Sequence, residues 1–203
     1  MIKKNLFDLQ KPDPINESET KLLFKYLEKS FNRIEFLKIL NLFRAKGIYE
    51  IPEKEFEILK NIFLLIADKI KQEKDIACAK LIIIISQTFY CKINGKKIYN
   101  QNYLKNHDMI LDLEIWEIYI NESIDEELNR IERIKKKDDN NVYTKNKIKN
   151  VLSSQLIPFS DNMIDFGMTV ENLNKIIDPI LEKYEIKDEI KNVIEDIIKS
   201  KEK

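Results

Sequence analysis

The chain has 203 residues, of which 43% are hydrophobic and 34% charged, and its 35 basic and 35 acidic residues give a formal net charge of zero. This hydrophobic content is sufficient for a core, and the length is typical of one domain. Proteins that wrap nucleic acid through phosphate contacts are normally basic, so the neutral total disfavours wrapping and leaves room only for local contacts.

The scarcity of turn residues favours an all-α fold, because only three glycines and five prolines occur. Cys78 and Cys91 lie in apolar sequence and match no metal or redox motif, which is typical of buried thiols in a reducing compartment. The N-terminal segment does not resemble a signal peptide, and the longest apolar runs are far shorter than the roughly 20 residues of a membrane span. We therefore expect a cytoplasmic protein without membrane insertion.

The beginning of the chain divides into an arm and a helix. Residues 1–18 contain two prolines and little periodicity, so we expect an extended arm there and a single helical domain over residues 19–203. Apolar residues at helical spacing predict one helix over about residues 19–46, which Gly47 ends in a left-handed cap.

Two further helices are predicted before the middle of the chain. The first opens at Pro52, a residue suited to a first helical turn. The second covers about residues 76–91, with Asp75 as its N-cap, and its apolar circumference predicts a central, fully buried helix. An alternative stays open, because the Asn-Gly pair at 94–95 is a strong hairpin signal and residues 88–99 could form two strands.

The second half of the chain is predicted to be helical except for one polar loop. The expected segments are a short helix at 103–106, a long helix at 109–136, an exposed loop at 135–144, a helix at 145–163 bent or interrupted at Pro158, a helix from Thr169 to 184 kinked at Pro179, and a last helix at 187–200. The whole is an all-α bundle of about seven to eight helices.

The inventory of reactive side chains disfavours an enzyme. The single histidine, His107, has no Ser or Cys arrangement that would use it as a base. Three isolated glycines form no phosphate-binding loop, and no His-Glu-x-x-His, Cys-x-x-Cys or nucleophile-elbow motif occurs. The acidic pairs at 126–127 and 138–139 are typical of solvated surface. We expect a non-catalytic binding protein with no cofactor and no metal.

A basic segment is the strongest functional candidate. Eight positive residues stand against three acidic ones between residues 130 and 149, a local excess of five. An aromatic side chain in its loop could stack on a base, so the segment could contact nucleic acid, although lysines at a helix end also simply favour the helix dipole. The candidate contact residues are Arg130, Arg133, Lys135, Lys136, Lys137, Tyr143, Lys145, Lys147 and Lys149.

Three motifs resemble those of a known family. They are Ser86-Gln87-Thr88-Phe89-Tyr90, Ile115-Trp116-Glu117 and Asn162-Met163-Ile164-Asp165-Phe166-Gly167. Over about residues 35–185 the chain resembles the SET-binding-factor type helical domain of myotubularin-related pseudophosphatases and a vertebrate brain protein, which implies a helical scaffold without known catalytic activity. Large side chains in and near these motifs should be core, and Ser86, Gln87 and His107 could satisfy buried backbone groups.

A stand-alone copy in a Lys-, Asn- and Ile-rich chain also resembles the ribosome dormancy factors of microsporidia. That resemblance implies a monomer that binds the tRNA exit site, contacts the L1 stalk and the small-subunit head, and inhibits translation by steric exclusion. Its partners would be rRNA, contacted by the basic segment at 130–149, and ribosomal proteins. The alternative is a protein–protein adaptor in membrane traffic or signalling, which has no need of the local positive excess.

Overall fold

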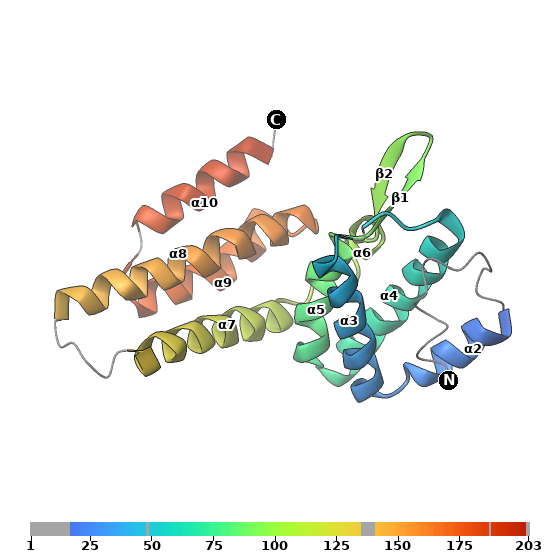
Figure 1. The fold of residues 1–203 in the computed structure, drawn as a ribbon. Coiled ribbons are helices and arrows are strands. Elements are labelled where there is room, and N and C mark those ends of the chain that lie inside the picture. Colours follow the sequence, from blue (N-terminus) through green and yellow to red (C-terminus); the bar gives the residue numbers. More distant parts are fainter. Residues whose placement is uncertain (1–16, 48, 135–140, 187, 202–203) are drawn as a thin grey trace. The chain divides into compact units, whose positions relative to one another are not determined.

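The computed structural model describes residues 17–47, 49–134, 141–186 and 188–201. These residues form nine helices and a single two-stranded sheet, which confirms the predicted all-α class (Figure 1). No helix in these ranges combines the length and the apolarity needed to cross a membrane. The predicted arm lies outside the described residues except for its last two residues, which belong to the first helix of the structure.

The chain divides into two compact units, Met1–Met109 and Ile110–Lys203, and each is described by itself. The predicted single domain over residues 19–203 stays a prediction. The first unit contains α2 (Glu17–Tyr26), α3 (Ser30–Ala45), α4 (Glu53–Glu73), α5 (Ile76–Ser86), β1 (Tyr90–Ile93), β2 (Lys96–Tyr99) and α6 (Gln101–Leu104). Within it, α3 and α4 both pack against α5, which is central as predicted but not fully buried, since Ala77 and Ile84 are exposed.

The predicted helix over 76–91 is too long, and the hairpin alternative is correct. Helix α5 ends at Ser86, and β1 and β2 then pair antiparallel across Asn94 and Gly95. These two turn residues have φ of 51° and 76°, the left-handed values that a two-residue hairpin turn of this type requires. The helical interpretation failed because residues such as Cys91 are buried in the strand, so their apolar character did not distinguish the two structures.

The single helix predicted over 19–46 is two helices. The sequence has no Gly or Pro at the break after Tyr26. Instead, side chains of α3 satisfy carbonyl groups at the end of α2 and just after it. Asn32 Nδ2 donates to the Tyr26 carbonyl oxygen at 2.7 Å, and Arg33 Nη1 donates to the Glu28 carbonyl oxygen at 2.8 Å. The predicted ending of α3 is confirmed, since Gly47 has φ of 76°.

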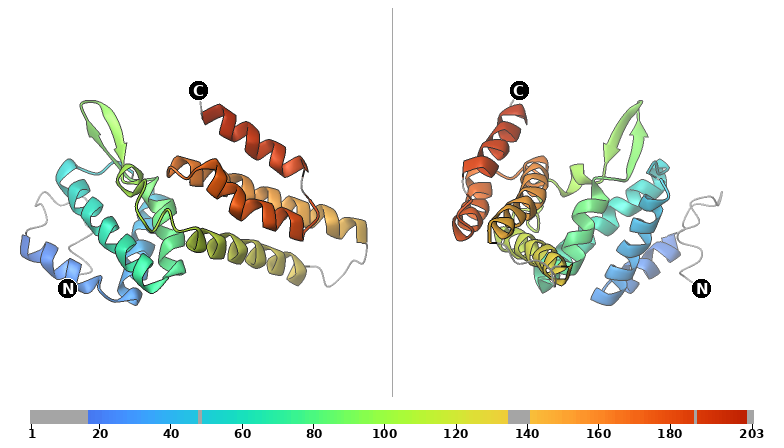
Figure 2. Two further views of the ribbon diagram at one scale, coloured as in Figure 1. Left: turned by 180° about the vertical axis from the view of Figure 1, so that it is seen from behind. Right: turned by 60° about the vertical axis from the view of Figure 1, so that its left-hand side comes forward.

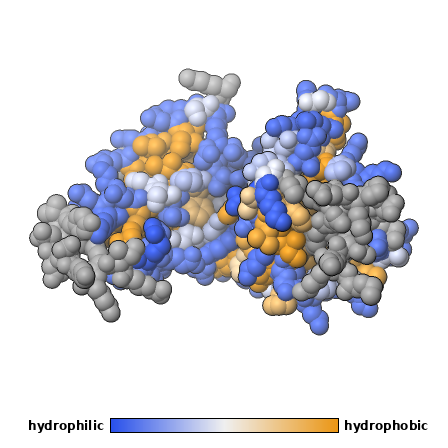
Figure 3. Space-filling view, viewed as in Figure 1, coloured by the Kyte–Doolittle hydropathy of each residue, from blue (hydrophilic) through white to orange (hydrophobic). Residues whose placement is uncertain are grey.

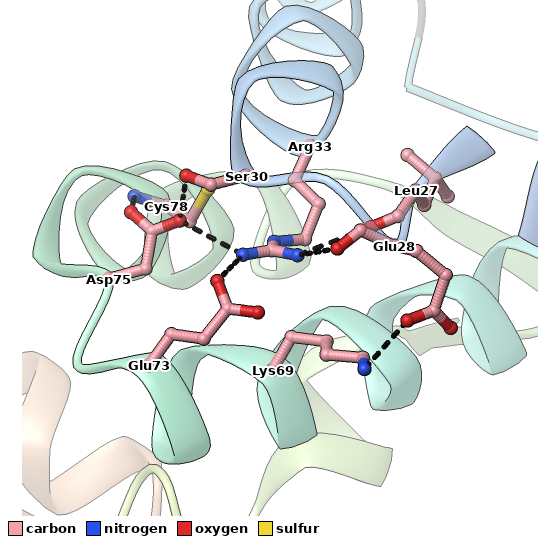
Figure 4. Close-up of polar contacts among 8 residues, drawn as sticks. All are labelled: Leu27, Glu28, Ser30, Arg33, Lys69, Glu73, Asp75 and Cys78. Carbon is pink, nitrogen blue, oxygen red and sulfur yellow. Dashed lines mark hydrogen bonds and ion pairs between the residues drawn. The ribbon is translucent and has the colours of Figure 1, made fainter. Parts of the chain in front are cut away.

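A polar cluster around the buried Arg33 joins four elements of the first unit (Figure 4). The Arg33 side chain has no exposed surface, and its Nη2 pairs with Glu73 at the end of α4 and with Asp75 at 3.3 Å. Asp75 caps α5 as predicted, because its Oδ1 accepts from the Cys78 amide at 3.2 Å, and its Oδ2 accepts from Ser30 at 2.6 Å. The cluster therefore fixes the ends of α2, α3, α4 and α5 against one another.

The second unit is a helical bundle in which α8 packs against the three other helices (Figure 2). Its elements are α7 (Leu113–Ile134), α8 (Asn141–Asp165), α9 (Val170–Lys183) and α10 (Asp188–Lys201). Helix α8 starts earlier than predicted and runs without interruption through Pro158, and α9 likewise contains Pro179. The predicted cap of α9 is confirmed, since the Thr169 hydroxyl accepts from the Asn172 amide at 3.3 Å.

Most of the large side chains of the family-like regions are core residues, as predicted. Trp116 is fully buried, and its Nε1 donates to the Ile110 carbonyl oxygen at 2.6 Å. Its ring centroid lies 6.4 Å from that of Phe159 and 6.3 Å from that of Phe166. The buried members are Phe89, Trp116, Tyr119, Met163 and Phe166, whereas Tyr90 is half-buried.

Candidate nucleic-acid interface

The structure describes only part of the predicted basic segment at 130–149. Lys135, Lys136 and Lys137 lie outside the described residues, as do the side chains of Arg133 and Tyr143. The remaining members lie at the C-terminal end of α7 and the N-terminal part of α8.

Two described members of the basic segment are already paired. Arg130 is exposed, and its Nε and Nη2 donate to the carboxylate of Glu127 at 2.8 and 2.5 Å. Lys149 forms an ion pair with Glu189 of α10. Lys145 is exposed and Lys147 half-buried, and both lie beyond the first turn of α8. The helix dipole acts mainly within the first and last turns, so it does not account for these two lysines.

The β1–β2 hairpin is a second basic surface, which was not predicted from the sequence. Figures 1 and 2 show the two strands projecting from the helices of the first unit. Lys92, Lys96 and Lys97 are exposed, and the register pairs Tyr90 with Tyr99 and Lys92 with Lys97. Since directly opposite residues share one face of an antiparallel pair, that face carries both tyrosines and two of the lysines. We call it the Tyr-Lys face; Figure 3 shows that the surface over the hairpin is mostly hydrophilic.

The Tyr-Lys face contains an unfavourable pair of like charges. Lys92 and Lys97 lie directly opposite each other, an arrangement that destabilises a hairpin. Two contacts offset the repulsion: Lys92 Nζ lies 2.7 Å from a Glu50 carboxylate oxygen, and Lys97 Nζ lies 4.5 Å from the centroid of the Tyr90 ring. The hydrogen bond and charge of Lys92 lower the pKa of Glu50, and the same ion pair raises the pKa of Lys92. The face thus keeps a local excess of positive charge.

The base of the hairpin is held firmly by the rest of the unit. The segment before α4 runs beside β1, so that the Tyr90 amide donates to the Tyr49 carbonyl oxygen at 3.0 Å and the Ile51 amide donates to the Tyr90 carbonyl oxygen at 2.9 Å. The Tyr90 and Tyr99 rings pack with centroids 5.4 Å apart, and Cys91 on the opposite face is fully buried. The face is therefore presented on a fixed support, a favourable property for a binding site.

A sequence signal for this surface did exist. Between Asp75 and Asp108 the chain contains five lysines and no acidic residue. A count of charge along the chain, combined with the Asn-Gly turn, would have found it. Interpreting residues 76–91 as one helix hid the signal, because it separated Tyr90 from Tyr99.

The side chains that most often perform chemistry are engaged in structural contacts. His107 Nδ1 accepts from the Met109 amide at 3.1 Å, and its Nε2 lies 3.3 Å from an Asp68 carboxylate oxygen. Burial, with the nearby Asp75 carboxylate, raises the pKa of the Cys78 thiol to about 12, and burial also raises the pKa of Cys91. Within the described ranges, no group of three His, Cys, Asp or Glu side chains is placed to hold a metal ion.

The fold and these surfaces define a helical protein with a projecting basic hairpin. No family model, no curated protein and no solved structure matches the chain. The resemblance to the SET-binding-factor type helical domain therefore stays a prediction carried by the sequence motifs.

Proposed function

We propose that the chain is a non-catalytic binding protein that acts on the ribosome as a dormancy factor, occupying the tRNA exit site and inhibiting translation. The sequence resemblance suggests this role, and the Tyr-Lys face is the observation that supports it best. A chain with no net charge concentrates lysines and aromatic rings on an exposed hairpin. Ribosomal RNA offers the matching partners, which are phosphates and unstacked bases.

Inhibition in this proposal requires occupancy and no reaction. A chain that fills the exit site excludes deacylated tRNA for as long as it stays bound. The zero net charge implies that binding relies on local contacts and that ribosomal proteins share the interface with rRNA. The basic segment at 130–149 is the second candidate contact with rRNA.

Competition with deacylated tRNA tests the proposed site. Ribosomes from the source organism are loaded with labelled deacylated tRNA, and the chain is added in increasing amounts. We expect release of the tRNA and a parallel fall in translation in a cell-free extract. Full retention of the tRNA at saturating chain would contradict binding at the exit site, even if the chain still bound elsewhere on the ribosome.

The adaptor function is a second candidate, because α3 exposes large apolar side chains. Phe31 and Leu42 are 69% and 62% exposed, and their spacing of three helical turns places them on one face of the helix. Figure 3 shows an apolar area over this part of the first unit. Under the adaptor function, Phe31→Ser with Leu42→Ser abolishes capture of a protein partner; under the ribosome function, the same variant leaves tRNA release unchanged.

A further inference from the structure

The Tyr-Lys face combines the two features that bind unpaired nucleic acid. Tyr90 and Tyr99 supply aromatic rings at the base of the hairpin, and Lys92 and Lys97 follow on the same face toward the turn. Lys96, although exposed, pairs with Ile93 and therefore lies on the opposite face of the hairpin. Aromatic side chains on a sheet surface stack on splayed bases in the common RNA-binding modules, and the surrounding basic residues contact the phosphates.

The present contacts of Lys97 and Lys92 indicate an anionic partner. The ammonium of Lys97 lies over the Tyr90 ring, and the repulsion between the two opposite lysines is only partly offset by Glu50. A phosphate between the lysines would relieve that repulsion, because an opposite charge interacts favourably with both of them. Movement of Lys97 onto a phosphate would also uncover the ring face that a base can use.

We infer that the Tyr-Lys face of the β1–β2 hairpin binds an unpaired RNA segment, with a base stacked on Tyr90 or Tyr99 and the flanking phosphates on Lys92 and Lys97. That this RNA is ribosomal rests on the proposed function. Each strand has four residues and so spans about 13 Å, which is room for about two bases. Duplex RNA does not fit this arrangement, since its bases are stacked inside the helix and its deep major groove excludes side chains.

Binding of a labelled oligouridylate of about ten nucleotides to the full chain tests the inference, with an RNA duplex of the same length as the comparison. We expect the single strand to bind in a salt-dependent manner and the duplex to bind at least about tenfold more weakly. Replacing Lys92 and Lys97 with Gln should weaken binding and reduce the slope of log K against log salt by about 0.7 for each lysine. Tyr99→Leu should weaken binding by about tenfold, whereas Tyr99→Phe, which keeps the ring, should retain it.

The matched control replaces Lys38 and Lys54 with Gln. Both are exposed lysines of the first unit, on α3 and α4, so the control removes the same charge away from the hairpin. Circular dichroism of every variant confirms that the helices are retained. Equal affinity of the hairpin and control variants for the oligouridylate, or no binding by the unaltered chain at low salt, would overturn the inference.

Pelleting of the same variants with ribosomes separates this inference from the proposed function. If the hairpin and control variants bind ribosomes equally well, the hairpin is not part of the interface. The ribosome function is then still supported. Oligouridylate binding through the hairpin by a chain that never pellets with ribosomes supports the RNA site and overturns the ribosome function. Lysines that only protect an edge strand from aggregation would change solubility and neither of these affinities.

Discussion

Arg33 is the one charged side chain among the described residues that is fully buried. Its guanidinium donates to the carbonyl oxygens of Leu27 and Glu28 and pairs with the carboxylates of Glu73 and Asp75. Burial opposes its charge, but the hydrogen bond and the negative charge of Glu73 outweigh that effect and raise the pKa of Arg33. The residue is thus a structural centre of the first unit, and its neighbours depend on it for their partners.

Substitution of Arg33 should strongly destabilise the fold. Arg33→Met leaves the carbonyl groups of Leu27 and Glu28 without this donor and removes the cation that pairs with Glu73 and Asp75, so we expect the free energy of unfolding to fall by about 2–3 kcal/mol. Arg130→Met is the matched control, because Arg130 is exposed and solvent screens its pair with Glu127, so its loss should change stability little. Urea denaturation followed by circular dichroism measures both. Equal losses in the two variants would contradict a structural role of the cluster around Arg33.

Asp75 should make the stability of the chain depend on pH in the acid range. Burial raises its pKa, but hydrogen bonds from Ser30, Cys78 and Arg33 outweigh burial and hold the pKa below its ordinary value. A carboxylate whose pKa is lower in the folded than in the unfolded chain stabilises the fold above its unfolded pKa of about 3.9. That contribution is lost as the pH falls through the folded pKa.

The variant Asp75→Asn isolates this charge, because Asn is also a good N-cap. We expect it to be less stable than the unaltered chain at pH 7, and the difference to shrink as the pH falls below about 4. Urea denaturation over a pH series measures the difference, with Asp125→Asn, an exposed position on α7, as the control. A difference that stays constant between neutral and acid pH would show that the Asp75 charge does not stabilise the fold.

Among the elements, the hairpin depends on its turn. Gly95 has φ of 76°, and a Cβ added there would meet no atom within 4 Å, so the cost of a side chain is conformational only. We expect Gly95→Ala to destabilise the hairpin by about 1–2 kcal/mol, and Gly95→Asn by less, because Asn tolerates left-handed backbone. Hydrogen exchange of the β1 and β2 amides measures this local stability. Equal protection in Gly95→Ala and in the unaltered chain would contradict the strained turn.

Element boundaries with a local cause could be predicted from the sequence. Gly47, Asp75 and Thr169 end or cap helices as expected, because their effect depends only on residues within a turn of them. The break after Tyr26 could not be predicted, since its carbonyl groups are satisfied by side chains of the following helix, including Asn32. Such capping leaves no mark on the hydrophobic periodicity.

The candidate site shows the same division between local and non-local information. The basic segment at 130–149 was found by counting charges, because its residues are close together in the sequence. The Tyr-Lys face exists only through strand pairing, which brings Tyr90 beside Tyr99 and Lys92 beside Lys97. The sequence shows both the Asn-Gly turn and the lysines. It does not show the strand register that places Lys92 and Lys97 on one face with the two tyrosines.

For the whole molecule, the central feature is a neutral total with locally uneven charge. Asp75 and Asp108 enclose a stretch with five lysines and no acid, and residues 130–149 carry a further excess of five positive charges. A chain without net charge is not attracted uniformly to RNA, so binding depends on these surfaces and should be sensitive to salt. The Tyr-Lys face and the basic segment at 130–149 should therefore be tested with separate sets of variants.

Co-sedimentation with ribosomes from the source organism, at low and then at high salt, tests the ribosome function most directly. We expect the chain to migrate with ribosomes at low salt and to be released as the salt concentration rises. We also expect weaker binding when Lys135, Lys136 and Lys137 are replaced with Glu. A chain that stays at the top of the gradient at every salt concentration would contradict the ribosome function and favour the adaptor function.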